Sequence, residues 1–354
     1  MTSFNEVCID VTKTAKKIPQ SDYLVSGKYK IFDQGKDYIG GYTNDKTEIV
    51  EDYPYIVFGD HTRIVKFVDE PCFIGADGVK LLKVYNSQFL PKYVYYSLVA
   101  NPIVSLGYSR HFKYLKEQSI RDCSINEQER IITELETNEK AISIKKESLS
   151  SLDELVKSRF IEMFGYPFTN EKGYPLLTID DVMSFQGGSQ PDKKYFEYTK
   201  TDENVRLIQI RDYKTDKFIT YIPKSMAKRY CTKEDIMIGR YGPPIFQILQ
   251  GIEGSYNVAL MKAIPKMGNR DFIRYFLKQD CLLEYLQQYC KRVAGQDGIQ
   301  MDKLKEFPFP YPPIELQNEY AEFVKLIDKS KFIVQQQIKD LQELLDSKMD
   351  EYFR

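Results

Sequence analysis

Two short loops in this sequence place polar side chains directly after a glycine that ends an apolar run. The first loop follows Ile56–Phe58 and Gly59, and it carries Asp60, His61, Thr62 and Arg63. The second follows Ile236–Ile238 and Gly239, and it carries Arg240 and Tyr241. In the DNA major groove, aspartate accepts a hydrogen bond from cytosine and arginine donates two to guanine. Both loops therefore carry side chains suited to reading bases.

Further polar side chains of this kind occur in the second half. Gln209 and Arg211 leave one apolar run, and Gln190 and Lys193 lie in a loop that begins with glycines. Glutamine pairs with adenine through two hydrogen bonds, and lysine contacts phosphates. Lysines and tyrosines alternate through the same region. We interpret these residues as candidate DNA contacts, and the alternative for such a mixture is an ordinary solvated surface.

Residues suited to catalysis or metal binding are scarce. The sequence has neither the phosphate loop Gly-x-x-x-x-Gly-Lys-Ser/Thr nor the dinucleotide fingerprint Gly-x-Gly-x-x-Gly. Its two histidines, His61 and His111, are not spaced for a zinc site or a catalytic triad. The segment 241–245 resembles a methyltransferase motif but lacks the polar acceptor, and Pro191-Asp192 begins a nuclease-like pattern with the wrong spacing. We therefore predict no catalytic residue and no metal site.

Composition limits the class of protein. The chain has 354 residues, enough for two or three domains, and a formal net charge of −1. No apolar run approaches the roughly 20 residues that span a bilayer, and the first ten residues lack the apolar stretch of a signal peptide. The six cysteines form no Cys-x-x-Cys pair, so we expect reduced core residues in a cytoplasmic protein.

A long helical segment occurs twice. Ile125–Phe164 reappears as Ile314–Phe353, shifted by 189 residues without a gap, and Gln128 matches Gln317. Both copies share one heptad phase, which favours a coiled coil in which the two helices pack together. The expected seam consists of Leu135, Ile142, Leu149, Leu152, Val156, Val324, Val334, Ile338, Leu341 and Leu345. Lys331 and Lys348 occupy seam positions as charged exceptions, and we expect them near its ends or facing partner subunits.

The repeat extends into the segments between the helices. Segment 56–60 aligns with 236–240, and 75–83 aligns with 254–262. Short β-branched and aromatic runs there are separated by Gly, Pro, Asn and Asp, which predicts strands joined by turns. Helices are expected at Pro91–Ala100 and Arg270–Arg292. The predicted fold class is α+β, organised as a domain at 1–124, a helix at 125–165, a domain at 166–313 and a helix at 314–354.

This arrangement resembles the specificity subunit of a type I restriction–modification system. The resemblance covers essentially the whole chain, and it rests on the order and duplication of three segments: Gly187–Pro191, the hairpin 236–242, and Pro312–Gln317. In the family these segments resemble the opening of a target-recognition domain, its strand-Gly-Arg-x-Gly hairpin and the start of a conserved helical region. In the first half, Gly59–Arg63 with Gly75–Gly78 resembles a variant recognition domain, although Thr12–Lys16 replaces the usual opening.

The resemblance implies a DNA-recognition subunit without chemistry of its own. Two recognition domains would each read one half of a bipartite target in double-stranded DNA, and the two helices, packed antiparallel, would set their spacing. Two methyltransferase subunits would bind S-adenosylmethionine, and restriction subunits would bind ATP and magnesium. The chain itself would hold no cofactor and contact no membrane.

Two other functions remain open from the sequence. The chain is alternatively a scaffold that pairs two protein-binding modules through its coiled coil, without DNA. It is alternatively an enzyme whose site does not follow a known motif. Methyltransferase partners that co-purify with the chain would distinguish the specificity subunit from both.

Overall fold

The structure is a computed structural model, and it describes residues 1–105, 107, 109–241, 244–289, 291–293 and 296–354. The chain divides into two compact units. Unit 1 comprises Met1–Ser148 and Val334–Arg354, and unit 2 comprises Leu149–Ile333. Each unit therefore contains the start of one long helix and the end of the other.

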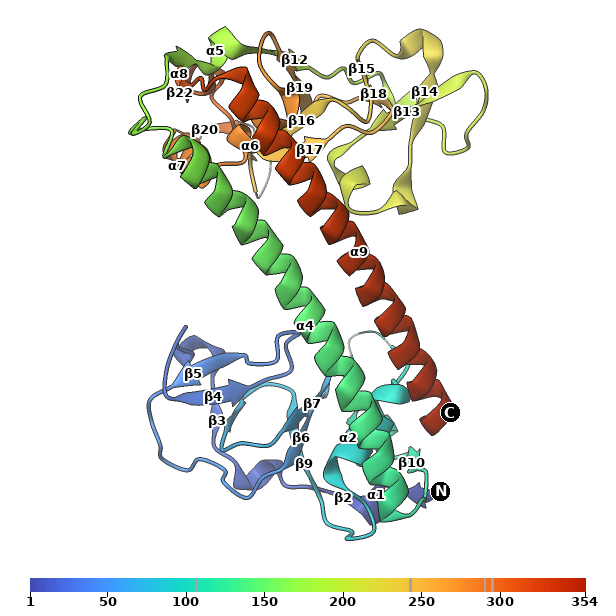
Figure 1. The fold of residues 1–354 in the computed structure, drawn as a ribbon. Coiled ribbons are helices and arrows are strands. Elements are labelled where there is room, and N and C mark those ends of the chain that lie inside the picture. The colour runs from blue at the N-terminus through green and yellow to red at the C-terminus, as the bar shows by residue number, and fades with distance from the viewer. Residues whose placement is uncertain (106, 108, 242–243, 290, 294–295) are drawn as a thin grey trace. The chain divides into compact units, whose positions relative to one another are not determined.

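The two long helices lie where the repeat predicts them. They are α4, Ile125–Phe164, and α9, Ile314–Phe353, each 40 residues long (Figure 1). At the start of α4, the N–H of Glu127 donates to the Ser124 hydroxyl at 3.2 Å, which caps the first turn. In each unit the start of one long helix contacts the end of the other, so the pairing is antiparallel.

Unit 1 contains two four-stranded sheets and one short two-stranded pair. The first sheet has the order β2-β9-β6-β7, with strands Cys8–Asp10, Val79–Val84, Tyr55–Gly59 and Val65–Val68. The second has the order β3-β8-β4-β5, with strands Lys17–Ile18, Phe73–Gly75, Tyr29–Phe32 and Gly41–Thr43. The short pair is β1, Thr2–Ser3, with β10, Ser119–Ile120.

Unit 2 repeats this plan with a larger body. Its first sheet has the order β12-β19-β16-β17, with strands Met183–Gly187, Leu260–Pro265, Ile236–Gly239 and Gln247–Gln250. Its second has the order β14-β13-β18-β15, with strands Tyr221–Pro223, Asn204–Ile208, Gly254–Tyr256 and Tyr230–Cys231. Two short pairs complete it: β11, Leu176–Thr178, with β22, Pro308–Pro310, and β20, Lys291–Val293, with β21, Gln296–Gly298. The first sheets of the two units therefore share one strand order, as the duplicated sequence predicts.

The shorter helices cover these sheets. Unit 1 has α1, Phe4–Val7, α2, Pro91–Ala100, and α3, Phe112–Leu115. Unit 2 has α5, Ile179–Val182, α6, Arg270–Leu277, α7, Asp280–Gln288, and α8, Met301–Glu306. The single helical segment expected at Arg270–Arg292 is wrong: the helix stops at Leu277, Gln279 adopts extended backbone, and the segment ends in strand β20.

One glutamine at the start of each long helix fastens that helix to its unit. Gln128 and Gln317 are both fully buried. The amide oxygen of Gln128 accepts the N–H of Leu90, which precedes α2, at 2.8 Å. The amide oxygen of Gln317 accepts the N–H of Asn269, which precedes α6, also at 2.8 Å. The matched glutamines of the repeat therefore do the same structural work in the two units.

Two further contacts of the long helices also occur in equivalent form in both units: a tyrosine–carboxylate hydrogen bond and an aromatic pair. Tyr96 of α2 donates to Glu139 of α4 at 2.7 Å, and Tyr275 of α6 donates to Asp328 of α9 at 3.2 Å. At the helix ends, the ring of Phe353 lies 5.2 Å from Tyr93, and the ring of Phe164 lies 4.8 Å from Phe272. Each aromatic pair lies in the core of its unit, where such rings stabilise packing.

The expected seam residues are distributed over both units. In unit 1, Leu135 and Ile142 are buried, and Leu345 packs against the core that contains Leu135. In unit 2, Val156 and Val324 are buried in one core, against which Leu152 packs. The other four are half-buried: Leu149, Val334, Ile338 and Leu341.

The two charged seam residues have partners on the opposite helix of their own unit. Lys331 pairs with Asp153 in unit 2, and Lys348 pairs with Glu134 at 3.2 Å in unit 1. Charged residues at such positions favour one register of helix pairing over others. The two ion pairs therefore favour the observed register of α4 against α9 within each unit.

The cysteines in the described part of the chain are free thiols: Cys8, Cys72, Cys123, Cys231 and Cys281. Burial raises the pKa of Cys8 and of Cys72 to about 12, so these thiols stay protonated at neutral pH. Cys290 lies outside the described residues.

Candidate DNA-contact surfaces

The glycine-bounded tip of unit 1 is the turn between β6 and β7. Asp60 begins this turn, but it is only 5% exposed, because its carboxylate accepts the N–H of Phe112 at 2.8 Å. Its backbone carbonyl also accepts the N–H of His111 at 2.8 Å. Asp60 therefore ties the tip to the start of α3, and its carboxylate is directed into the fold.

The other three predicted residues of this tip differ in exposure. Thr62 is exposed, whereas His61 and Arg63 are half-buried. Arg63 adopts a left-handed backbone with φ 65°, and its guanidinium donates to the carbonyl of Ile103 at 3.2 Å. Thr62 is thus the residue of the predicted tip most available to a ligand.

The glycine opening of unit 2 packs closely on the loop between β18 and β19. A Cβ on Gly188 would overlap the carbonyl oxygen of Asn257, so only glycine fits there. The next residue, Ser189, donates its N–H to the Tyr256 carbonyl at 3.0 Å. Gln190 and Lys193 follow on an exposed segment, with Lys193 at the start of a short 3-10 turn.

Arg240 lies beside this opening. Its N–H donates to the Ala259 carbonyl at 2.9 Å, and its guanidinium lies 3.5 Å from the Val258 carbonyl and over the ring of Tyr241. A Cβ on Gly187 would lie 3.8 Å from the guanidinium, so the glycine opening and Arg240 are neighbours. Gly242 of the predicted hairpin motif lies outside the described residues, as does Pro243 of the methyltransferase-like segment.

Gln209 and Arg211 meet on one buried hydroxyl. Both donate to the Thr220 oxygen, at 3.1 Å and 3.2 Å. The residue between them, Ile210, lies 3.0 Å from the position of a Cβ on Gly239, the residue before Arg240. The fold therefore gathers Gln209, Arg211 and Arg240 at the same end of the sheets of unit 2.

An acidic residue that the sequence did not single out supports this loop. The Asp212 side chain is buried, and burial raises its pKa. One of its oxygens accepts the N–H of Gln209 at 3.3 Å and lies 3.4 Å from the Arg206 guanidinium, which also pairs with Asp216 at 3.0 Å. Asp212 and Arg206 thus fix the backbone from which Gln209 and Arg211 project.

A basic and aromatic hollow of about 630 Å³ lies next to Arg211. The residues that line it include Tyr198, Lys200, Lys217 and Phe218. Arg211 and Lys217 lie over the Phe218 ring, at 5.8 Å and 5.6 Å from its centroid. The alternation of lysine and tyrosine in the sequence was the signal for this surface, although it did not show that these side chains share one hollow.

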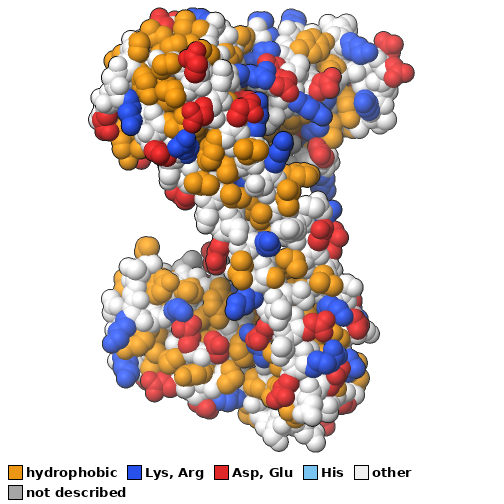
Figure 2. Space-filling model, in the orientation of Figure 1, with side chains coloured by type: hydrophobic (Ala, Val, Ile, Leu, Met, Phe, Trp, Pro, Cys, Tyr) orange, Lys and Arg blue, Asp and Glu red, His pale blue; other side chains and the backbone are white. Residues whose placement is uncertain are grey.

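Charge is mixed over the visible surface. On the face drawn in Figure 2, basic and acidic side chains are interspersed over each unit. Within the described residues, no group of three His, Cys, Asp or Glu side chains could hold a metal ion. None of the helices in that part of the chain is both long and apolar enough to cross a bilayer.

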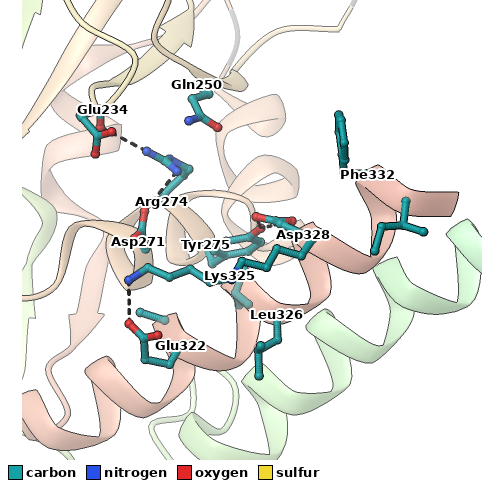
Figure 3. A pocket seen from close by; sticks show the side chains of 14 residues that line it. Glu234, Gln250, Asp271, Arg274, Tyr275, Glu322, Lys325, Leu326, Asp328 and Phe332 are labelled. Carbon is teal, nitrogen blue, oxygen red and sulfur yellow. Dashed lines mark hydrogen bonds and ion pairs between the residues drawn. The ribbon is translucent and has the colours of Figure 1, made fainter. Parts of the chain in front are cut away.

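A second hollow of unit 2 lies between α6 and α9. Figure 3 shows Tyr275 of α6 reaching Asp328 of α9, and Lys325 reaching Glu322. Leu326, Phe332 and Ile333 of α9 line the same hollow and are exposed. Exposed apolar side chains in a groove with a polar rim are typical of protein-binding surfaces.

Comparison with known proteins gives a family match that covers most of unit 2. Residues 171–343, which include the whole Gln209, Arg211 and Arg240 group, match the family described as the type I restriction modification DNA specificity domain. The fold of the whole chain is similar to that of the type I restriction–modification S subunit from M. genitalium, with TM-score 0.58, 15% identity, and coverage of 100% of this chain and 99% of that one. It is also similar to a chain from a structure of complex assembly and conformational transition in the type I R-M system, with TM-score 0.57, 13% identity, and coverage of 100% and 97%.

Proposed function

Because residues 171–343 belong to the type I restriction modification DNA specificity domain family, we propose that this chain reads a two-part DNA target and carries the methyltransferase subunits that modify it. Each unit would read one half-site, and bases between the half-sites would go unread. The chain itself would perform no chemistry. The predicted resemblance to a specificity subunit is confirmed, because residues 171–343 match the DNA specificity domain and the fold of the whole chain is similar to that of an S subunit.

One observation carries the proposal of two half-sites. Unit 1 repeats the first sheet of unit 2 strand by strand, and its tip after β6 occupies the position that Arg240 occupies after β16. The polar residues at these two points differ, Asp60 to Arg63 against Arg240 and Tyr241. Two similar frameworks with different polar tips suit two different short sequences.

Contacts in unit 2 divide by the chemistry of their side chains. Arg240 and Gln209 have donors suited to base edges, whereas the cations around the Phe218 hollow are suited to phosphates. In unit 1 the carboxylate of Asp60 already accepts a backbone N–H, so we assign Asp60 to positioning the tip and Thr62 to contact with DNA.

We infer two methyltransferase subunits from a second repeat on the long helices. Ile144 and Ile333 occupy equivalent positions, and so do Leu155 and Leu344. All four side chains are between 45% and 56% exposed. Unit 1 contains one isoleucine and one leucine of this set, and so does unit 2. The same apolar pair on each unit supports two copies of one partner.

Cofactors would be supplied by these partners. The methyltransferase subunits would bind S-adenosylmethionine, and restriction subunits would bind ATP and magnesium. The sequence of this chain contains no phosphate loop or dinucleotide fingerprint that would place these molecules on it.

The proposal is tested by expressing the chain with its methyltransferase partners and sequencing modified bases across the host DNA. We expect one bipartite motif with a fixed unread gap. Modification without sequence preference, or no association with the methyltransferase, would reject it. In the second case the chain would be a scaffold without a role in DNA modification.

A further inference from the structure

Gln34, a residue without a role so far, lies at the glycine-bounded tip of unit 1. It is the second residue after β4, and it is half-buried. Its amide oxygen accepts the N–H of His61 at 3.3 Å. The fold therefore brings Gln34 to a loop that follows it by 27 residues in the sequence.

Gly59, which begins the tip, and Gly78, which precedes β9, leave room for this side chain. A Cβ on Gly78 would lie 2.7 Å from the Gln34 amide oxygen and 2.9 Å from its amide nitrogen. A Cβ on Gly59 would lie 2.9 Å from the Gln34 Cβ. A larger residue at Gly78 would displace the Gln34 amide, and one at Gly59 would displace first the Thr62 hydroxyl and then Gln34. The two glycines therefore shape the space that the Gln34 side chain occupies.

The corresponding loop of unit 2 carries the DNA-contact candidates Gln209 and Arg211. They are the first and third residues after β13. β13 pairs antiparallel with β14 and parallel with β18, just as β4 pairs antiparallel with β5 and parallel with β8. In both units this loop meets the glycine that precedes the tip: Gln34 meets Gly59, and Ile210 meets Gly239. Gln34 thus occupies in unit 1 a position equivalent to that of the DNA-contact candidates Gln209 and Arg211 in unit 2.

We propose that Gln34 reads an adenine in the half-site recognised by unit 1. A glutamine amide donates to adenine N7 and accepts from its N6 amino group in a paired contact. The bond from the His61 N–H occupies one lone pair of the amide oxygen and orients the amide, which leaves the second lone pair and the NH₂ group to pair with a base. The inference rests on the proposed DNA-reading function. It assigns base contact in unit 1 to Gln34, because the Asp60 carboxylate is already bonded to the Phe112 N–H.

Two substitutions test the proposal in the full complex, with modified bases sequenced across the host DNA. Gln34→Ala is expected to let one base pair of the unit 1 half-site vary and to slow modification of the original target by roughly tenfold or more. Gln34→Glu keeps an acceptor for the His61 N–H but removes the NH₂ donor. It is expected to change the preferred base at that pair from adenine to cytosine, whose amino group suits a carboxylate.

The half-site read by unit 2 is an internal control in every sample. It is expected to stay unchanged, as is the whole motif in Lys36→Ala, a substitution of an exposed residue in the same loop. If Gln34→Glu retains the original motif, or if Gln34→Ala lowers modification equally at all sequences, Gln34 only supports the tip and the proposal is overturned. If the unsubstituted complex shows no bipartite motif, the proposed function has failed instead.

Discussion

At the scale of single residues, hydrogen bonds decide which polar side chains remain free for a ligand. Arg240 has a backbone N–H that is bonded within the fold, and its guanidinium makes a long 3.5 Å contact to a carbonyl and lies over the Tyr241 ring. Asp60 also has a bonded backbone N–H, but its carboxylate is in addition bonded to a backbone N–H. Side chains at equivalent points of the repeat therefore differ in the polar atoms that they leave for a ligand.

Arg240→Ala should relax one base pair of one half-site. The loss of a paired arginine–guanine contact costs about 1–3 kcal/mol of discrimination. Sequencing of modified bases should show that this pair varies while the other half-site is retained. Lys193→Ala, which removes an exposed lysine, should instead weaken binding at all sequences and reduce its salt dependence. A uniform loss in Arg240→Ala would mean that Arg240 contacts a phosphate.

The sequence indicated the chemistry of the tips better than their geometry. The pattern of an apolar run, glycine and polar residues identified Asp60 and Arg240 equally, because it contains no information on the partner of each side chain. The partner of Asp60 is Phe112, 52 residues further along the chain. The sequence pattern did not identify Gln34 for the same reason, because only the pairing of strands brings Gln34 to His61.

At the scale of elements, the matched glutamines make a paired experiment available. Gln128→Ala would leave the half-buried N–H of Leu90 without the Gln128 acceptor, and Gln317→Ala would do the same to Asn269. An unsatisfied buried donor costs about 1–3 kcal/mol. Hydrogen exchange should become faster in α2 for the first variant and in α6 for the second. Each variant is the control for the other, and equal effects in both units would contradict a local role.

Elements with strong periodicity were predicted to within one residue, and irregular ones were not. The heptads and the ungapped repeat at a shift of 189 residues located α4 and α9, because a long heptad pattern is typical of a helix and not of a strand. The break between α6 and α7 was missed because no proline or glycine marks it. The sequence alignment of residue 79 with residue 258 was wrong by two residues. In the sheets, Val79 pairs with Gly59 and Leu260 pairs with Gly239, so Val79 is equivalent to Leu260. An alternating apolar pattern aligns equally well after a shift of two residues, so the sequence did not reveal the insertion in the turn.

At the scale of the whole molecule, the repeated apolar pairs predict the stoichiometry of the complex. Ile144→Glu and Ile333→Glu should each remove one methyltransferase subunit, and the double variant should remove both, because a buried unpaired charge is costly. Native mass spectrometry of the complex measures this directly. Lys140→Glu and Lys329→Glu change equivalent exposed positions nearby and should leave two subunits bound. Loss of both subunits from either single isoleucine variant would contradict two separate sites.

The length of the long helices should set the unread gap if they act as the spacer. One heptad inserted into both α4 and α9 preserves the seam and adds about 10 Å at ~1.5 Å per residue. At about 3.4 Å per base, the gap should lengthen by up to three base pairs while both half-sites stay the same. Sequencing of modified bases reads out the gap. Insertion of seven residues in an exposed loop, such as 44–48, should leave it unchanged.

The composition of unit 1 has a consequence for how the chain is made. Its core includes Tyr352 and Phe353, yet all of unit 2 is translated between Ser148 and Val334. Unit 2 is continuous in sequence, so it is able to fold as soon as it leaves the ribosome, in the order in which domains usually form. Unit 1, although synthesised first, must wait with part of its core open until residues 334–354 emerge. Unit 1 is therefore the first unit to be synthesised and the last to complete its fold.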